Sequence, residues 1–226
     1  MKRTSFKTFD RARSFVVDGL NWRGAARPYA LVVWGLLAGL VWIGLDLALA
    51  GRVTGSLLLL KLVLLALLTA IAAIDARFGV IPDSLSGMLL FTGVLNVLVE
   101  SSHAAGTSPS TELTALMPAV DAIGWRFADA LIAFLAAIGL RACYRLVRSR
   151  DGFGLGDVKF VGAAALWVGL PMLPMMLIVA VLSAFATILL LRKQGGKLGG
   201  GDAIPFGPHL ALGLWLAFLL AAELTT

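Results

Sequence analysis

Cysteine and charged residues are both scarce in this chain. Its 226 residues include one cysteine, Cys143, which excludes an internal disulfide and a cysteine-based zinc site. Charged residues make up 14% and hydrophobic residues 59% of the chain, whereas a soluble domain has about 25% and about 45–50%. The composition therefore predicts a polytopic membrane protein rather than a soluble domain.

The sequence also lacks a phosphate-binding motif and the pattern of a cleavable signal peptide. The pattern Gly-x-x-x-x-Gly-Lys-Ser/Thr does not occur, so the glycines between 195 and 201 do not indicate a phosphate-binding loop. No cleavable signal peptide is expected, because the basic N-terminal stretch is too long and no Ala-x-Ala site follows a short apolar region.

Positive charge is concentrated at the N-terminus. The net charge is +6, and seven of the 19 basic residues lie within the first 27 positions. Next to a membrane span this pattern sets orientation and contacts anionic lipid, so we expect membrane lipids as partners and no nucleic acid. We predict a basic cytosolic tail over residues 1–28, with an interfacial helix as an open alternative. The transmembrane domain then covers residues 29–226.

Seven apolar runs predict an all-α bundle of about seven transmembrane helices. A helical crossing needs about 20 apolar residues, with about 17–25 tolerated, and a helix satisfies its own backbone groups within lipid. The third and fifth runs are short and are expected to be tilted or partly re-entrant. The runs cover residues 29–50, 56–74, 84–99, 123–147, 155–170, 172–191 and 204–223.

The distribution of basic residues predicts the orientation. A cytosolic N-terminus places segments 75–83, 148–154 and 192–203 inside, and 51–55 and 100–122 outside. The inside segments and the turns that lead into them are rich in basic residues, whereas the outside segments and the turns next to them offer Arg52 and Arg126. Asp75 ends the second run and Asp157 begins the fifth, so both carboxylates are expected at the same side and a similar depth.

Two carboxylates at one depth have a specific chemical use. A lone acid at a helix end is usually a cap in contact with water, but an acid within a span is costly unless it has a partner. Two neighbouring carboxylates cannot both ionise cheaply, so the pair is expected to share a proton. The charged member can activate a water while the protonated member polarises a peptide carbonyl.

Three sequence blocks resemble the type IV prepilin peptidases, membrane aspartyl proteases with a Gly-x-Gly-Asp motif. The first is Asp75-Ala76-Arg77-Phe78-Gly79-Val80-Ile81-Pro82-Asp83. The second is Gly152-Phe153-Gly154-Leu155-Gly156-Asp157-Val158-Lys159. The third is Ile204-Pro205-Phe206-Gly207-Pro208-His209-Leu210-Ala211-Leu212-Gly213. Order and spacing match this family from about residue 56 to 224.

The resemblance implies a bacterial inner-membrane aspartic endopeptidase without a metal or another cofactor. Asp75 and Asp157 match the two catalytic positions. The implied substrate is a prepilin or pseudopilin precursor, cut on the cytosolic side after a short basic leader, typically after glycine. Further residues of the motifs are expected to bind substrate or support the acids: Gly154, Gly156, Lys159, Pro82, Asp83, Pro205, Gly207 and Pro208.

The chain departs from the family pattern at two points. Many members carry two Cys-x-x-Cys pairs and also methylate the new N-terminus, whereas Cys143 is the one cysteine here. The resemblance is therefore to a short, peptidase-only form. His209 stands where an aromatic residue is common; it either tunes the acid pair, binds a metal or is structural.

Two other functions remain open from the sequence. A small proton-coupled transporter would use acids spread through the bilayer, among them Asp46 and Asp129. A non-catalytic component of a pilus or secretion assembly would need neither acid of the pair. Three further acids either offset the basic inside loops or form turns and helix caps: Asp83, Asp151 and Asp202.

Overall fold

The computed structural model describes residues 32, 35–41, 55–105, 112–148, 154–193 and 204–224. All regular structure in these ranges is helical, which confirms the all-α prediction. The elements are α4 (Gly55–Phe78), α5 (Asp83–Ala105), α6 (Glu112–Arg148), α7 (Leu155–Val168), the 3-10 turn η1 (Leu170–Met172), α8 (Leu173–Lys193) and α9 (Gly207–Leu224).

Four helical stretches are long and apolar enough to cross a membrane. They cover Gly55–Phe78, Asp83–Ser102, Val120–Val147 and Leu170–Lys193, and a shorter apolar helix covers Gly207–Ala221. The chain is therefore a multi-pass membrane protein. The count of seven crossings is not confirmed and stays a prediction, because the tail 1–28 and most of the first run, 29–50, lie outside the described residues.

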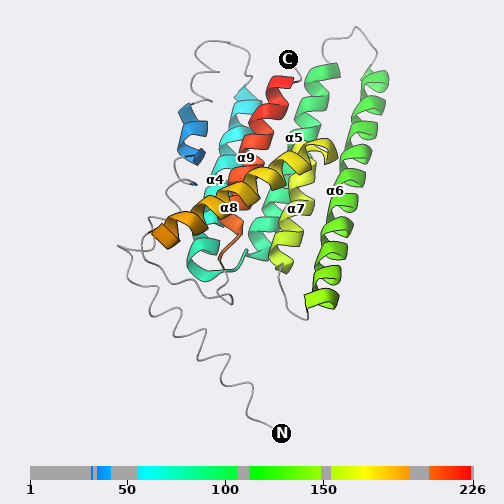
Figure 1. Cartoon of the computed structure of the whole chain (residues 1–226). Helices are drawn as coiled ribbons and strands as arrows, with labels where there is room; N and C mark the ends of the chain where they lie inside the picture. The colour runs from blue at the N-terminus through cyan, green and yellow to red at the C-terminus, as the bar shows by residue number, and fades with distance from the viewer. Residues whose placement is uncertain are drawn as a thin grey trace.

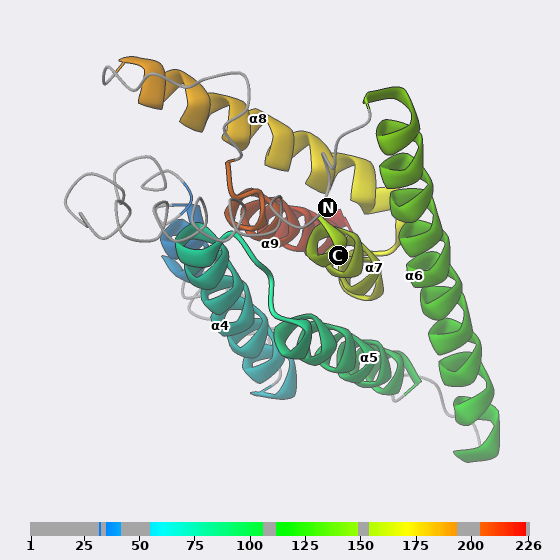
Figure 2. The ribbon, with the colours of Figure 1, turned by 90° about the horizontal axis from the view of Figure 1, so that it is seen from below.

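The helices form a bundle with α7 and α9 in its middle. Seen along the bundle, α4 and α5 lie on one side of these two helices, α8 lies on the opposite side and α6 stands beside α7 (Figure 2). Helices α4, α5, α6, α7 and α9 run roughly upright, whereas α8 crosses the bundle obliquely (Figure 1).

Helix α7 is central because it is apolar all round from Phe160 to Val168. Ten of its 14 residues are buried, as expected for a helix without a polar face. Its length is about 21 Å, less than the hydrocarbon thickness of about 30 Å. Protein surrounds α7, so its ends can lie within the bundle without exposing backbone groups to lipid. The expected fifth run, 155–170, is thus a short buried helix.

Two predicted boundaries between helix and loop are wrong. The outside loop was expected over 100–122, but α5 continues to Ala105 and α6 begins at Glu112. The apolar run marks the part that lies in lipid; the helix itself ends at a cap or breaker. The same reason extends α4 to Phe78, so that Asp75 lies within its last turn rather than after it.

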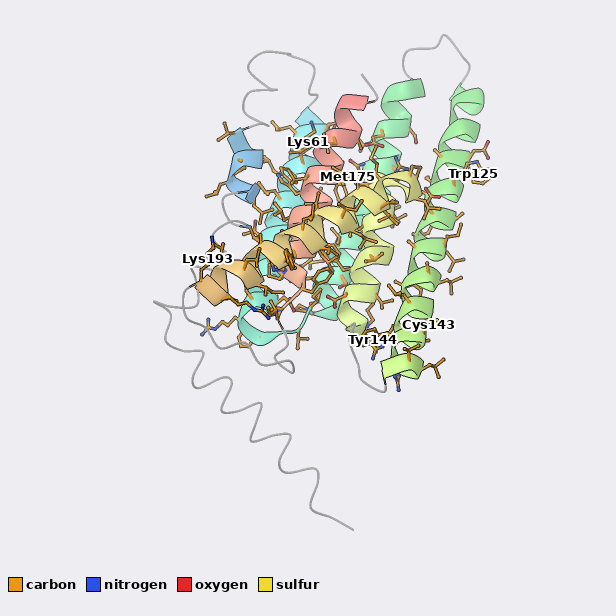
Figure 3. The ribbon with its side chains drawn as sticks, in the orientation of Figure 1. Lys61, Trp125, Cys143, Tyr144, Met175 and Lys193 are labelled. Carbon is orange, nitrogen blue, oxygen red and sulfur yellow. The ribbon has the colours of Figure 1, made fainter. Side chains whose placement is uncertain are left out.

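The outer surface of α6 has the character expected of a lipid-facing helix. Trp125 projects from α6 and its side chain is 73% exposed (Figure 3). Large apolar side chains are also exposed further along the helix, including Leu131, Leu135 and Leu140. Such side chains favour hydrocarbon over water, which supports α6 as a helix at the edge of the bundle.

Helices α8 and α9 approach closely at Gly213. A Cβ atom at this position would lie within van der Waals overlap of the Met176 carbonyl oxygen and 3.4 Å from Ala180 Cβ. Small residues allow this approach between membrane helices. The backbone of Met176 cannot move aside as a flexible side chain could.

We therefore expect Gly213→Ala to destabilise the protein by about 1–3 kcal/mol. Thermal unfolding in detergent measures this loss. Gly139→Ala is the matched control, because nothing lies within 4 Å of a Cβ atom at Gly139. Equal unfolding temperatures for the two variants would contradict the prediction.

Candidate functional site

Asp75 lies buried near the end of α4, with its side chain against the start of α9. The residue is 4% exposed, and the Gly207 N–H donates a hydrogen bond of 2.7 Å to Asp75 Oδ2. Directly after Asp75 the helix closes at Gly79, whose N–H donates to the Asp75 carbonyl oxygen (2.7 Å). Gly79 has φ of +66°, a conformation that glycine adopts readily at a helix C-terminus. The turn therefore redirects the chain immediately after the acid.

The third block supplies the hydrogen-bond donor for Asp75. Gly207 is the first residue of α9, where backbone N–H groups have no partner within the helix. Pro208 follows in the first turn, where a missing N–H costs nothing. A Cβ atom at Gly207 would lie 2.7 Å from Asp75 Oδ2 and 2.8 Å from Asp75 Cβ. Only glycine at position 207 leaves room for the carboxylate. Pro205, two residues earlier, precedes the helix and is partly buried.

Asp157 lies in the first turn of α7 and is half-buried. Its Oδ2 accepts a hydrogen bond of 3.2 Å from the N–H of Gly154, the residue that caps the helix. A negative charge is favourable at this end of a helix. Gly156 meets Ile81 of the segment after α4, since a Cβ atom at Gly156 would lie 3.0 Å from Ile81 Cβ. The glycine-rich block thus lies against the first block.

The two acids lie at the same end of the bundle. This is the lower end in Figure 1, where α4 finishes and α7 begins; we call it the acid end. Ile81, six positions after Asp75, packs against Gly156, the residue before Asp157. Each carboxylate accepts a backbone N–H at the start of a helix, from Gly207 and Gly154 respectively. Two carboxyl groups at one end of a bundle have the chemistry needed for proton transfer.

Lys159 and Asp83, expected separately as supporting residues, contact each other. Lys159 Nζ lies 2.6 Å from Asp83 Oδ1, and the ion pair joins α7 to the first residue of α5. Pro82 precedes this helix, and its carbonyl oxygen accepts the Ser86 N–H (3.2 Å). Sequence spacing could not reveal the pair, because its members are 76 positions apart.

His209 is fully buried in the first turn of α9, two residues after Gly207. Its Nδ1 lies 2.9 Å from Ser183 Oγ on α8, and the same hydroxyl donates to the Ala180 carbonyl oxygen (2.9 Å). The imidazole therefore links α8 to the beginning of α9. The sequence did not single out Ser183, whose one available signal was a hydroxyl within an apolar run.

The other candidate acids do not join this pair in the described part of the chain. Asp129 lies near the opposite end of the bundle, where its Oδ2 accepts the Leu170 N–H (3.0 Å). It thus caps the turn between α7 and α8, in line with a partner on a neighbouring helix. Asp46, Asp151 and Asp202 lie outside the described residues. Across the ranges that the structure describes, no group of three metal-ligating side chains comes together.

Known proteins resemble this chain in sequence. The family model of the type IV leader peptidase family matches residues 62–191. A prepilin leader peptidase/N-methyltransferase of Stutzerimonas stutzeri is 31% identical over 159 residues, which cover 70% of this chain and 48% of that protein. A protein of the same name from Dichelobacter nodosus is 31% identical over 157 residues, 70% of this chain and 47% of that protein.

A third relative, the prepilin leader peptidase/N-methyltransferase of Aeromonas salmonicida, is 29% identical over 169 residues, 74% of this chain and 51% of that protein. The chain thus matches about half the length of these curated relatives. No solved structure matches it. The matched range begins within α4 and ends within α8, so it includes Asp75, Asp157 and the Lys159–Asp83 ion pair. On this match, the chain belongs to the type IV leader peptidase family.

Proposed function

We propose that this chain is a membrane-embedded aspartic endopeptidase that removes the basic leader from prepilin-like precursors. The observation that carries the proposal is that Asp75 and Asp157 lie at the same end of the bundle, beside the contact between Ile81 and Gly156, although they are 82 positions apart in the sequence. The names of the relatives support leader cleavage as the reaction. Methyl transfer is not part of the proposal, since a single cysteine is present.

The proposed reaction uses the two carboxyl groups in opposite protonation states. The ionised member takes a proton from a water, whose oxygen then attacks the peptide carbonyl carbon. The protonated member donates a hydrogen bond to the carbonyl oxygen. As the carbon–nitrogen bond breaks, a carboxyl group returns a proton to the leaving amine, and the pair ends with the single proton with which it began.

The proposed setting is the cytosolic face of the bacterial inner membrane, with the N-terminus in the cytosol. Arg77 at the end of α4, and Arg192 and Lys193 in the last turn of α8, are exposed. Basic residues at the ends of spans favour the cytosolic side. A precursor whose apolar helix lies in the bilayer would present the peptide bond before that helix at this level.

Cleavage of a defined peptide tests the proposal. The purified chain, in vesicles of phosphatidylethanolamine and phosphatidylglycerol, is incubated with a synthetic precursor. This precursor has a basic leader that ends in glycine, followed by about 20 apolar residues. Mass spectrometry should find one cut, after the glycine. An intact peptide, together with proton flux across the vesicles, would favour the transporter instead.

Chelation should not change this activity, because the proposed chemistry needs two carboxyl groups and a water. We expect equal cleavage rates with and without excess EDTA. Addition of zinc to the treated enzyme should likewise have no effect. Loss of cleavage with EDTA and recovery with zinc would contradict the aspartic mechanism and indicate a metal enzyme.

A further inference from the structure

Two contacts join the segment after Asp75 to the start of α7. Ile81 packs against Gly156, next to Asp157. Two residues further along the chain, Asp83 forms its 2.6 Å ion pair with Lys159. Ile81 lies on the short connection between α4 and α5 and Asp83 is the first residue of α5, so both contacts hold the chain after Asp75 against the start of α7.

Further contacts continue along α5 and α7 in the same order. Trp167 Nε1 donates to the Leu89 carbonyl oxygen (2.9 Å), and Gly93 approaches the side chains of Leu166 and Trp167. The two helices therefore lie side by side, and both run upward from the acid end (Figure 1). Asp157 belongs to this α5–α7 pair of helices.

Asp75 belongs to a different pair of helices, formed by α4 and α9. Its carboxylate is hydrogen-bonded to Gly207 at the start of α9. Away from the acid end, the Trp167 ring of α7 packs edge-on against the Phe218 ring of α9, with 5.6 Å between centroids. The aromatic contact joins the α5–α7 pair to the α4–α9 pair away from the acid end. The contacts of Ile81 and Asp83 with α7 join them at the acid end.

We infer that the Lys159–Asp83 ion pair is a positioning device that sets the separation of the two acids. It holds the first residue of α5, eight positions after Asp75, against α7 two positions after Asp157, and so limits how far the two acids move relative to each other. The inference rests on the proposed function for its catalytic meaning. Lys159 and Asp83 act through the acids and do not touch the reacting peptide bond.

The exposure of the pair decides which effect to expect. The Lys159 side chain is 42% exposed and that of Asp83 is 76% exposed, so the pair contributes little to global stability. We expect the pair to affect the relative position of the two acids instead, and a small misplacement of catalytic groups greatly slows a reaction.

A charge-removing variant with a conservative partner tests the inference on activity. Lys159→Met should lower kcat about tenfold with little change in KM, while Lys159→Arg, which can still pair with Asp83, should retain most activity. Lys193→Met, which removes a lysine from the end of α8, should cleave normally. An unchanged kcat in Lys159→Met, or a change confined to KM, would overturn the inference.

A distance measurement tests it without any substrate. Spin labels are placed at Phe78→Cys and Leu155→Cys, which replace exposed side chains at the end of α4 and the start of α7. Cys143→Ser removes the native thiol. Dipolar coupling between the labels should show a broader or longer distance distribution in Lys159→Met and an unchanged one in Lys159→Arg.

The two measurements separate this inference from the proposed function. Identical distance distributions in all variants would overturn the positioning role even where activity falls. Altered distances in Lys159→Met, in a protein that never cuts the peptide, would support the positioning role while the peptidase proposal fails.

Discussion

Asp75→Asn and Asp157→Asn are each expected to lower the rate of peptide cleavage by at least about a hundredfold. Neither amide can exchange a proton with water or peptide as a carboxyl group does, so either substitution removes one half of the pair. The measurement is removal of the leader from the synthetic precursor in vesicles, followed over time by mass spectrometry.

Both variants should still fold and insert. In the parent protein the N–H of Gly207 or Gly154 donates a hydrogen bond to the carboxylate. The asparagine side chain keeps an oxygen that can accept the same hydrogen bond. Asp129→Asn is the matched control, because it also neutralises an acid while keeping an acceptor for the Leu170 N–H. It should cleave at the parental rate. Full activity in either variant of the pair would exclude the aspartic mechanism.

Gly207→Ala is expected to reduce cleavage about a hundredfold, although the substitution adds a single methyl group. The new Cβ atom would lie 2.7–2.8 Å from three side-chain atoms of Asp75, closer than packed atoms allow. Either the carboxylate turns away from the Gly207 N–H or the start of α9 shifts. Both responses misplace an acid whose position determines the rate.

Gly87→Ala is the control for Gly207→Ala. Gly87 lies in α5, and nothing lies within 4 Å of a Cβ atom at this position. Alanine there gains up to about 1 kcal/mol in helix propensity and should leave cleavage unchanged. The comparison needs equal amounts of folded protein, which thermal unfolding in detergent establishes. Equal cleavage rates in the two variants would show that the contact between Gly207 and Asp75 is not needed.

The three sequence blocks come together at the acid end. The first block carries Asp75, the second carries Asp157, and a backbone N–H of the third donates a hydrogen bond to Asp75. His209 fits this arrangement as a structural residue, because its ring is held by Ser183 close to Gly207. A role in tuning the acids stays a prediction.

The sequence by itself determined the class of the protein and the level of its two main acids. Long apolar runs with few charges can satisfy their backbone only as helices in lipid, and the alternation of runs puts Asp75 and Asp157 at one end. The limits of the helices did not follow from the apolar runs, because hydropathy marks lipid depth while α5 and α6 continue beyond it.

Only the tertiary structure decided which side chains meet. The contacts of Asp75 with Gly207 and of Lys159 with Asp83 join residues 132 and 76 positions apart. Such contacts depend on how helices rotate and pack, which no local pattern encodes. The burial of the short α7 among its neighbours likewise results from packing, and that packing sets the place of Asp157 beside the first block.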